Sequence, residues 1–249
     1  MTTRNPSVSA IIPVYNSEAF LLDAVASIRR QRIDVLEIII VNDGSTDGTA
    51  EAIETLNGPI RSASQPNSGP AAARGRGIQM ARGNVVAFLD ADDLWPNDKL
   101  EIQLGHLATH PSVDVVLGQT QHIRQSSVAP GEARYEKGAD PWTTLMFGAA
   151  LIRTSAFETV GLPDRSFRFD DDVDWFLRAK ELGVSIMTHP DVAVLYRRHE
   201  SNLTNQRMTD QHYFLMALKR SIERRRRAGN GNVSPLDDWF DRDEKSTRA

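Results

Sequence analysis

Three carboxylates crowd together where an apolar run ends. Asp90, Asp92 and Asp93 directly follow Val85–Leu89, a run typical of a strand buried on both faces. Because an isolated buried carboxylate is very costly, we expect these acids just beyond the carboxyl end of the strand, where open α/β sheets bind ligands. Two carboxylates on one short turn suit a hard divalent cation and a phosphate substrate. The alternative is a solvated acidic turn that caps the next helix.

Two further loops are predicted at the same edge of the sheet. The first carries Pro13, Tyr15 and Asn16, and the second carries Asp43. The carboxyl ends of parallel strands share one edge, so these loops should converge with Asp90. An aromatic ring and a carboxylate there suit a nucleobase, by stacking and by accepting an N–H. For Asp43, an Asx-turn or a helix cap is the local alternative.

The elements that must position these residues alternate along the first half of the chain. Apolar runs predict strands, and apolar residues at helical spacing predict helices between them. Such alternation is typical of an α/β fold with a mostly parallel central sheet flanked by helices. The strands are expected at 8–14, 36–41, 60–64, 85–89 and 113–118, and the helices at 18–30, 49–56, 71–81 and 97–109.

The second half has a less regular pattern. Residues 119–140 are polar and predict a mobile surface segment, whereas 145–152 are apolar and buried, as helix or strand. The remaining pattern predicts helices at 155–160, 170–182 and 204–227 and a pair of short strands within 184–195. It also predicts a disordered tail from 228, except around Trp239 and Phe240. There is no internal repeat.

The overall composition excludes several classes of protein. The chain has 249 residues, no cysteine and a net charge of -4. Disulfides, thiolate metal sites and cysteine nucleophiles are therefore excluded, and no basic excess favours a nucleic acid partner. No apolar stretch reaches the roughly 18 residues of a membrane span, and the N-terminal apolar run is too short for a signal peptide. A cytoplasmic location is expected. Neither G-x-G-x-x-G after the first strand nor a P-loop motif is present.

Several linked motifs resemble one enzyme family. IIPVYNSEAFL, IIIVNDGSTDGT, NSGPAAARGRGIQMARG and VVAFLDADD, in this order, are similar to the N-terminal half of family 2 inverting glycosyltransferases of GT-A fold. The resemblance covers about the first hundred residues. One departure is Gly75, where members usually carry Asn after the Arg of the third motif. This puts any side-chain role at position 75 in doubt.

The resemblance implies a nucleotide diphosphosugar donor, with a UDP-sugar favoured. Pro13, Tyr15 and Asp43 would hold the base, and Arg74 would lie near the nucleotide. Asp90 and Asp92 would be the D-x-D pair, contacting the ribose and a divalent metal (Mn²⁺ or Mg²⁺) on the diphosphate. Residues 1–118 would bind the donor, 119–228 would form the acceptor-binding and catalytic half of the same domain, and 229–249 a disordered tail.

An acidic segment of the second half resembles the family's E-D-x-D-L-W-x-R motif. FDDDVDWFLRA has Asp171 where Glu is usual and places Asp172 as the catalytic base. An inverting transfer needs one carboxylate to accept the proton of the acceptor hydroxyl. Acids in a first helical turn are also favoured by the helix dipole alone. Asp171 is the main alternative to Asp172 as the base, and Asp174 is expected to have a structural role.

A basic segment follows. YRRHESNLT resembles the family's Y-R-x-H segment, so His199 would complete the metal shell or touch the diphosphate, and Arg197 or Arg198 would pair with phosphate. Trp95 and Trp175 are expected in the core. Arg224–Arg227 form a solvated face or, alternatively, attract an anionic membrane surface, which would bring the protein to the inner face of the membrane.

The leading hypothesis is a metal-dependent inverting glycosyltransferase that acts on a glycan or lipid-linked acceptor. The alternative is a catalytically inactive module that binds nucleotide sugars. A nucleotidyltransferase would need a Gly-rich, Arg-containing first loop, and an aspartyl-phosphate phosphatase would carry its D-x-D after the first strand. The sequence leaves the donor sugar, the acceptor and the oligomeric state open.

Overall fold

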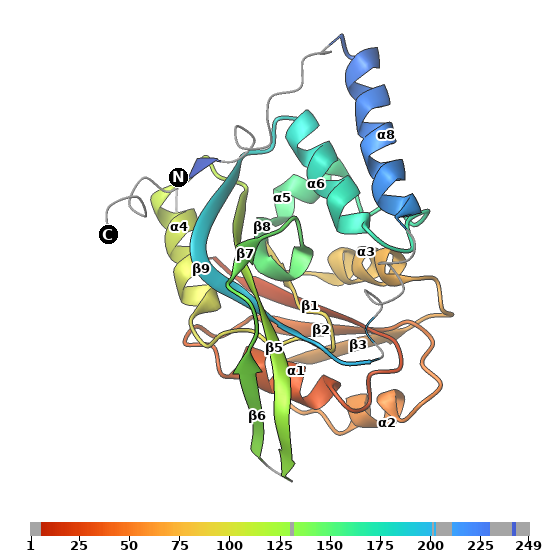
Figure 1. Cartoon of the computed structure of the whole chain (residues 1–249), viewed down its shortest axis with the longest axis vertical. Coiled ribbons are helices and arrows are strands. Elements are labelled where there is room, and N and C mark those ends of the chain that lie inside the picture. The colour runs from red at the N-terminus through yellow and green to blue at the C-terminus, as the bar shows by residue number, and fades with distance from the viewer. Residues whose placement is uncertain (1–5, 130–131, 201, 203–210, 230–240, 243–249) are drawn as a thin grey trace.

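One mixed, mostly parallel sheet runs through the molecule, with helices packed on it (Figure 1). The computed structural model describes residues 6–129, 132–200, 202, 211–229 and 241–242. In the described part, the strand order is β10-β9-β5-β8-β4-β1-β2-β3, with β6 and β7 pairing with β5 outside this path. The predicted α/β class is thus confirmed.

The first half follows the predicted alternation closely. β1 pairs in parallel with β2 and β4, and β2 pairs in parallel with β3, so that these carboxyl ends share one edge. The strands are β1 (Val8–Val14), β2 (Glu37–Asn42), β3 (Ile60–Ser64) and β4 (Val85–Phe88), and the helices are α1 (Leu21–Arg29), α2 (Thr49–Glu54), α3 (Pro70–Met80) and α4 (Lys99–Thr109).

Small residues let α3 lie directly on the sheet. Ala71, Ala72 and Ala73 are buried, and a Cβ on Gly77 would come within 2.4 Å of Ile11 Cγ2 in β1. Only glycine allows that approach without displacing the strand. This packing fixes α3 with its first two turns at the carboxyl edge of the sheet, where the acidic loop after β4 also lies.

The second half inserts an antiparallel strand into the sheet. β8 pairs antiparallel with both β4 and β5. The sequence left open whether the apolar stretch 145–152 is a helix or a strand. In the structure this stretch contains a 3₁₀ turn followed by most of strand β8. The elements are β5 (Val115–Ala129), β6 (Glu132–Lys137), β7 (Trp142–Thr143), η1 (Phe147–Ala149), β8 (Ala150–Arg153), α5 (Thr154–Val160), α6 (Asp171–Glu181), β9 (Ile186–Arg197), α8 (His212–Arg227) and β10 (Asp241–Arg242).

The prediction of a mobile segment at 119–140 is wrong. β5 continues far beyond residue 118, and β6 folds back on it as an antiparallel ribbon that extends past the rest of the sheet (Figure 1). β5 also pairs in parallel with β9 along most of its length. Cross-strand hydrogen bonds thus order a stretch whose polar side chains gave no apolar alternation.

Two further predictions need correction. The expected pair of short strands in 184–195 is one long strand, β9, whose register against β5 shifts between Leu117 and Thr120. Within the predicted disordered tail, Asp241 and Arg242 form a parallel pairing with Met187 and Thr188. The rest of the tail from 230, and residues 204–210 of the predicted last helix, lie outside the described residues.

Candidate functional site

Arg74 is the centre of the candidate site. One guanidinium nitrogen, Nη1, donates to both carboxylate oxygens of Asp171, at 2.7 and 2.9 Å, and Nη2 donates to Asp90 Oδ1 at 2.8 Å. The three side chains come from α3, the N-terminus of α6 and the loop after β4. Although burial lowers the pKa of Arg74, the charges of Asp171 and Asp90 raise it well above its usual range. The arginine therefore joins both halves of the chain.

Asp172 lies beside this ion pair in the first turn of α6. Burial, and then the negative charge of Asp171, raises its pKa to about 7. Its Oδ1 accepts the backbone N–H of Val173 at 2.8 Å. Asp170, which precedes the helix, has a left-handed φ of 60° that turns the chain into α6. A carboxyl group poised near neutral pH is what general base chemistry requires.

The other two acids of this turn have structural partners. Asp171 is 2% exposed and is held by Arg74, which argues against the rival role as base. Asp174 is 1% exposed and pairs with Arg178 at 2.8 Å and with Arg224 of α8 at 3.3 Å. These contacts support the structural role that the sequence predicts for Asp174.

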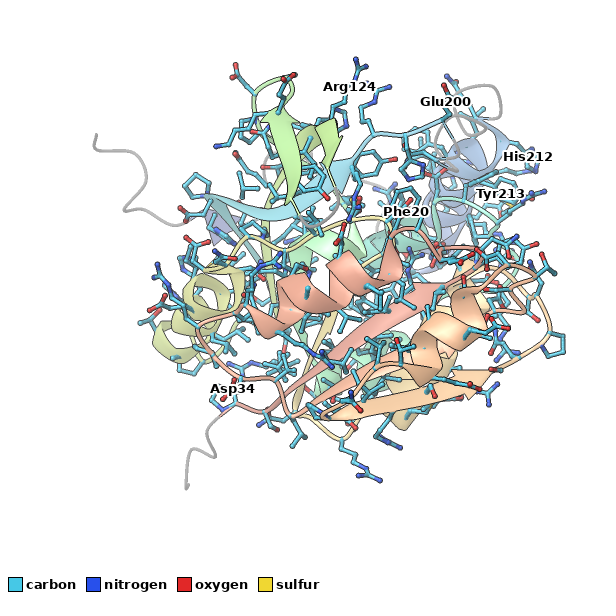
Figure 2. All side chains as sticks on the ribbon, turned by 90° about the horizontal axis from the view of Figure 1, so that it is seen from below. Phe20, Asp34, Arg124, Glu200, His212 and Tyr213 are labelled. Atoms are coloured by element: carbon cyan, nitrogen blue, oxygen red, sulfur yellow. The ribbon has the colours of Figure 1, made fainter. Side chains whose placement is uncertain are left out.

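Asp92 and His199 meet although they are 107 positions apart. His199 Nε2 lies 3.1 Å from Asp92 Oδ2, and Asn202 Nδ2 lies 3.3 Å from the same oxygen. The His199 ring stacks on Phe20, with centroids 4.4 Å apart. Phe20, which immediately precedes α1, lies on the same side of the view in Figure 2 as Glu200, the neighbour of His199.

Phe20 and Asn202 were missed by the sequence reasoning. Phe20 falls within the helix predicted at 18–30 and was given no role at the site, and Asn202 was not singled out. The proximity of Asn202 to His199 in the chain was the one available signal. Asp90 accepts a hydrogen bond from Arg74, and no contact joins it to Asp92 or His199 among the described hydrogen bonds. Its role as a metal ligand therefore stays a prediction.

The loops predicted to hold a base are tied to one another. Asp43 Oδ1 accepts from the Gln65 side chain at 2.8 Å and from Ser68 N at 3.0 Å, and Oδ2 accepts from Gly69 N at 2.8 Å. A carboxylate can accept about four hydrogen bonds, so Asp43 has about one acceptor position left for a ligand. Asp43 thus fixes the loop that leads into α3 and Arg74, and its reading of a base stays a prediction.

Tyr15 and Pro13 differ in exposure. Tyr15 is 47% exposed at the end of β1, which leaves its ring accessible, whereas Pro13 is half-buried within the strand. Asn16, the residue after Tyr15, accepts from Thr46 N through its Oδ1 at 2.8 Å, and its backbone N–H donates to Ser45 Oγ at 3.0 Å. These bonds hold the loops after β1 and β2 together.

Arg197 does not fit the predicted phosphate role. It is 2% exposed, and its guanidinium lies over the rings of Phe20 and Tyr135, at 5.1 and 5.4 Å, and donates to Asp23 at 3.2 Å. Since Tyr135 belongs to β6 and Asp23 to α1, the arginine fastens the β5–β6 ribbon to the first half. Arg198 is exposed. The predicted core positions of Trp95 and Trp175 agree with their exposures of 1% and 0%.

A second group of possible metal ligands lies elsewhere. Within the described residues, ligand atoms of His106 in α4 and of His189 and Asp191 in the first half of β9 come within 4.8 Å of one another. The Gln103 amide nitrogen, which donates to two backbone carbonyls, lies 3.2 Å from His189 Nε2. His189 Nδ1 lies 3.3 Å from Asp191 Oδ2, and the His189 ring stacks on His106 with centroids 5.1 Å apart. These three residues are therefore a second candidate metal site, apart from Asp92 and His199.

Residues 9–161 match the model of Glycosyl transferase family 2. The chain belongs to this family. Among its relatives, this family 2 chain is 42% identical over 218 residues to the uncharacterized glycosyltransferase EpsJ of Bacillus subtilis, which covers 80% of the chain and 63% of EpsJ. It is 40% identical over 106 residues to an uncharacterized glycosyltransferase of Haemophilus influenzae, which covers 41% of the chain and 42% of that relative.

Solved structures confirm the GT-A fold. The mannosyltransferase PcManGT of Pyrobaculum calidifontis, in complex with GDP-Man and Mn²⁺, superposes with a TM-score of 0.70 at 21% identity, over 89% of this family 2 chain and 65% of that one. Staphylococcus aureus TarS 1-349 in complex with UDP gives a TM-score of 0.60 at 21% identity, over 77% and 60%. At this identity the likeness shows the fold alone.

Proposed function

We propose that this family 2 chain transfers a sugar, with inversion and with a divalent cation, from a nucleotide diphosphosugar to an acceptor hydroxyl. The observation that carries the proposal is the Asp90–Arg74–Asp171 network. It links the loop after β4 to α6 and leaves Asp172, beside it, as a carboxyl group with a pKa of about 7.

Asp172 would act as the general base. The acceptor hydroxyl gives its proton to the Asp172 carboxylate while its oxygen forms a bond to the anomeric carbon. The bond from that carbon to the diphosphate breaks in the same step, and the nucleoside diphosphate leaves with the electron pair. No catalytic acid is needed because the leaving group is stable as an anion. Arg74 would be a positioning residue, since it fixes Asp171 directly before the base in α6.

Asp92 and His199 suit a divalent cation. One carboxylate oxygen and one imidazole nitrogen, 3.1 Å apart and both partly exposed, are ligand types that Mn²⁺ accepts. Cations of this class keep few protein ligands and complete their shell with substrate phosphate oxygens. When bound, such an ion would stabilise the charge that develops on the departing diphosphate. Phe20, stacked on His199, would keep the imidazole in place.

The donor would lie along the loops after β1, β2 and β4. The exposed Tyr15 ring would stack on the base, with Pro13 and Asp43 beside it and Asp90 toward the ribose. UDP and GDP-Man in the two solved structures support a nucleotide donor. We favour a UDP-sugar as donor and a glycan or lipid-linked hydroxyl as acceptor.

The proposal is tested with water as acceptor, which needs no knowledge of the natural one. A panel of UDP- and GDP-sugars is incubated with the chain and Mn²⁺, and nucleoside diphosphate release is measured. NMR of the freed sugar at early times should show the anomer opposite to that of the donor. Retention of configuration would contradict the proposed mechanism. The absence of release from every donor that binds would favour the inactive binding module.

Two variants separate the roles. Asp172→Asn should lower the release rate roughly 10²- to 10⁴-fold, the usual contribution of a general base, while donor binding is retained. Asp92→Asn should weaken Mn²⁺-dependent donor binding. Asp34→Asn is the matched control, since Asp34 is an exposed acid just before β2, at the edge of the sheet opposite the candidate site, and it should leave both properties unchanged. Full activity of Asp172→Asn would show that the base is another residue.

A further inference from the structure

Helix α8 carries an unusual share of the exposed apolar surface. In the described part of the chain, nine large hydrophobic side chains are exposed, and four of them belong to this one helix. They are Phe214, Leu215, Leu218 and Ile222, with exposures of 38%, 59%, 37% and 42%. Scattered exposed apolar residues are ordinary, but a contiguous group marks a surface that binds something.

The helical repeat gathers these side chains on one face. Phe214, Leu218 and Ile222 are spaced four apart, and Leu215 lies beside them, so they form a stripe along the helix. The opposite face is packed: Ala217 is buried against Phe167 and Leu177, on the side of the molecule that α6 occupies (Figure 1). Figure 2 shows the start of this helix at the labelled His212 and Tyr213.

The charged residues of α8 also differ between its packed side and its exposed side. The helix has six basic residues and one acid, Glu223. Arg220 and Arg224 serve the packed side, where Arg220 bonds to Asp164 at 2.8 Å and Arg224 to Glu181 and Asp174. Lys219 and Arg226 are exposed and adjoin the apolar stripe.

We infer that the outer face of α8 binds an anionic membrane surface. An apolar stripe bordered by lysine and arginine is the pattern of a helix that lies in the headgroup region of a bilayer. Negative lipid headgroups match the basic border, whereas a second copy of this chain would bring like charges together. No helix in the described residues has the length and apolar content to cross a membrane, so α8 would lie on the surface rather than span it.

This location would serve the candidate site without being part of it. α8 packs on α6, and the first turn of α6 carries Asp171 and Asp172. A membrane contact through α8 would therefore hold that turn at a fixed distance from the lipid. The inference concerns binding alone, so it stands or falls independently of the transfer reaction.

Vesicle co-sedimentation tests the inference with the full chain. Vesicles of phosphatidylcholine alone are compared with vesicles that contain phosphatidylglycerol, at low and at physiological salt. The chain should bind the anionic vesicles and leave the neutral ones largely unbound. The double variant Leu215→Gln/Ile222→Gln, made at two exposed positions, should partition at least about tenfold more weakly. Lys219→Gln/Arg226→Gln should weaken binding by a similar factor and reduce its salt dependence.

Matched controls come from exposed residues elsewhere. Leu36→Gln removes an equally exposed leucine, and Arg82→Gln/Arg124→Gln removes two exposed arginines outside α8. These variants should bind like the original chain. The inference is overturned if the original chain does not bind anionic vesicles or if the α8 variants bind as it does. It is also overturned if sedimentation shows a dimer that Leu215→Gln/Ile222→Gln dissociates.

Discussion

Two buried cations, Arg74 on α3 and Lys99 on α4, show how differently this fold treats a positive charge. Both are nearly inaccessible, at 7% and 1% exposure, and both rest against an aromatic ring, Phe147 and Trp95 respectively. Arg74 has two carboxylates as partners. Lys99 Nζ has only neutral ones, namely the Gln103 side chain at 2.9 Å and two backbone carbonyls near β8 at 3.2 and 3.4 Å.

The difference in partners decides what each charge can do. The charges of Asp90 and Asp171 keep Arg74 protonated, so its field at the candidate site is constant. For Lys99, burial without an opposing charge lowers the pKa to about 7. We conclude that Arg74 organises acids for chemistry, while Lys99 braces the turn before β8 by hydrogen bonds that need little charge. Loss of the Arg74 charge should therefore cost far more stability than loss of the Lys99 charge.

Removal of the arginine should have the largest effect. Arg74→Met would leave Asp90 and Asp171 close together in a poorly solvated place, with no compensating cation. Breaking a buried pair in this way costs about 3–5 kcal/mol of unfolding free energy. Urea denaturation of the original chain and of the variant at pH 7.5 measures this. A loss below 1 kcal/mol would mean that the two acids do not depend on Arg74.

Asp172→Asn should stabilise the protein, in contrast to Arg74→Met. The folded pKa of Asp172 is raised from 3.8 to about 7, so the folded state binds the proton more tightly than the unfolded state does. The stabilising effect of protonation is complete below pH 4 and is lost as the pH rises through 7. The advantage of the variant should therefore grow between pH 4 and 7, to about 2–4 kcal/mol, and then stay constant.

Asp171→Asn is the neighbouring control for that series. It weakens the partner of Arg74, so it should destabilise the chain at pH 7.5. Thermal unfolding of both variants from pH 4 to 8 gives the comparison. If Asp172→Asn loses stability as Asp171→Asn does, Asp172 is a structural acid and its role as base is wrong.

Lys99→Met should have the smallest effect and a distinct pH dependence. Below pH 7 the lysine is charged in both states, so the lost hydrogen bonds and the removed buried charge offset each other to within about 2 kcal/mol. Between pH 7 and 10.5 the unfolded state binds more protons, so the original chain gains stability relative to the variant. The gain should be about 1–3 kcal/mol at pH 9. A pH-independent difference would show that Lys99 keeps an ordinary pKa.

The sequence predicted the first half well because its signals are local. Parallel strands such as β1 and β2 are continuous apolar runs, and Ile60–Ser64 was predicted with the observed bounds. The β5–β6 ribbon was missed because its strands are polar and their order comes from pairing with each other and with β9. Such pairing between distant strands leaves no pattern in the local sequence.

The candidate site was predicted in part. Linked motifs brought the acids after β4 together with Asp172, but not the bond between Arg74 and Asp171, which are 97 positions apart. The sequence assigned Arg74 to the nucleotide, whereas its observed partners are acids. The buried position of Arg197 was also beyond prediction, since it depends on Phe20 and Asp23 at the start of α1 and on Tyr135 of β6.

Nucleotide binding with and without metal shows whether Asp92 holds a cation that binds the donor. Calorimetric titration with UDP and with GDP is carried out on the original chain, Asp92→Asn and Asp172→Asn, each with Mn²⁺ and with a chelator. At least one nucleotide should bind only with Mn²⁺, Asp92→Asn should lose this binding, and Asp172→Asn should keep it. Equal binding in the chelator, or by Asp92→Asn, would show that Asp92 does not hold a cation that binds the nucleotide.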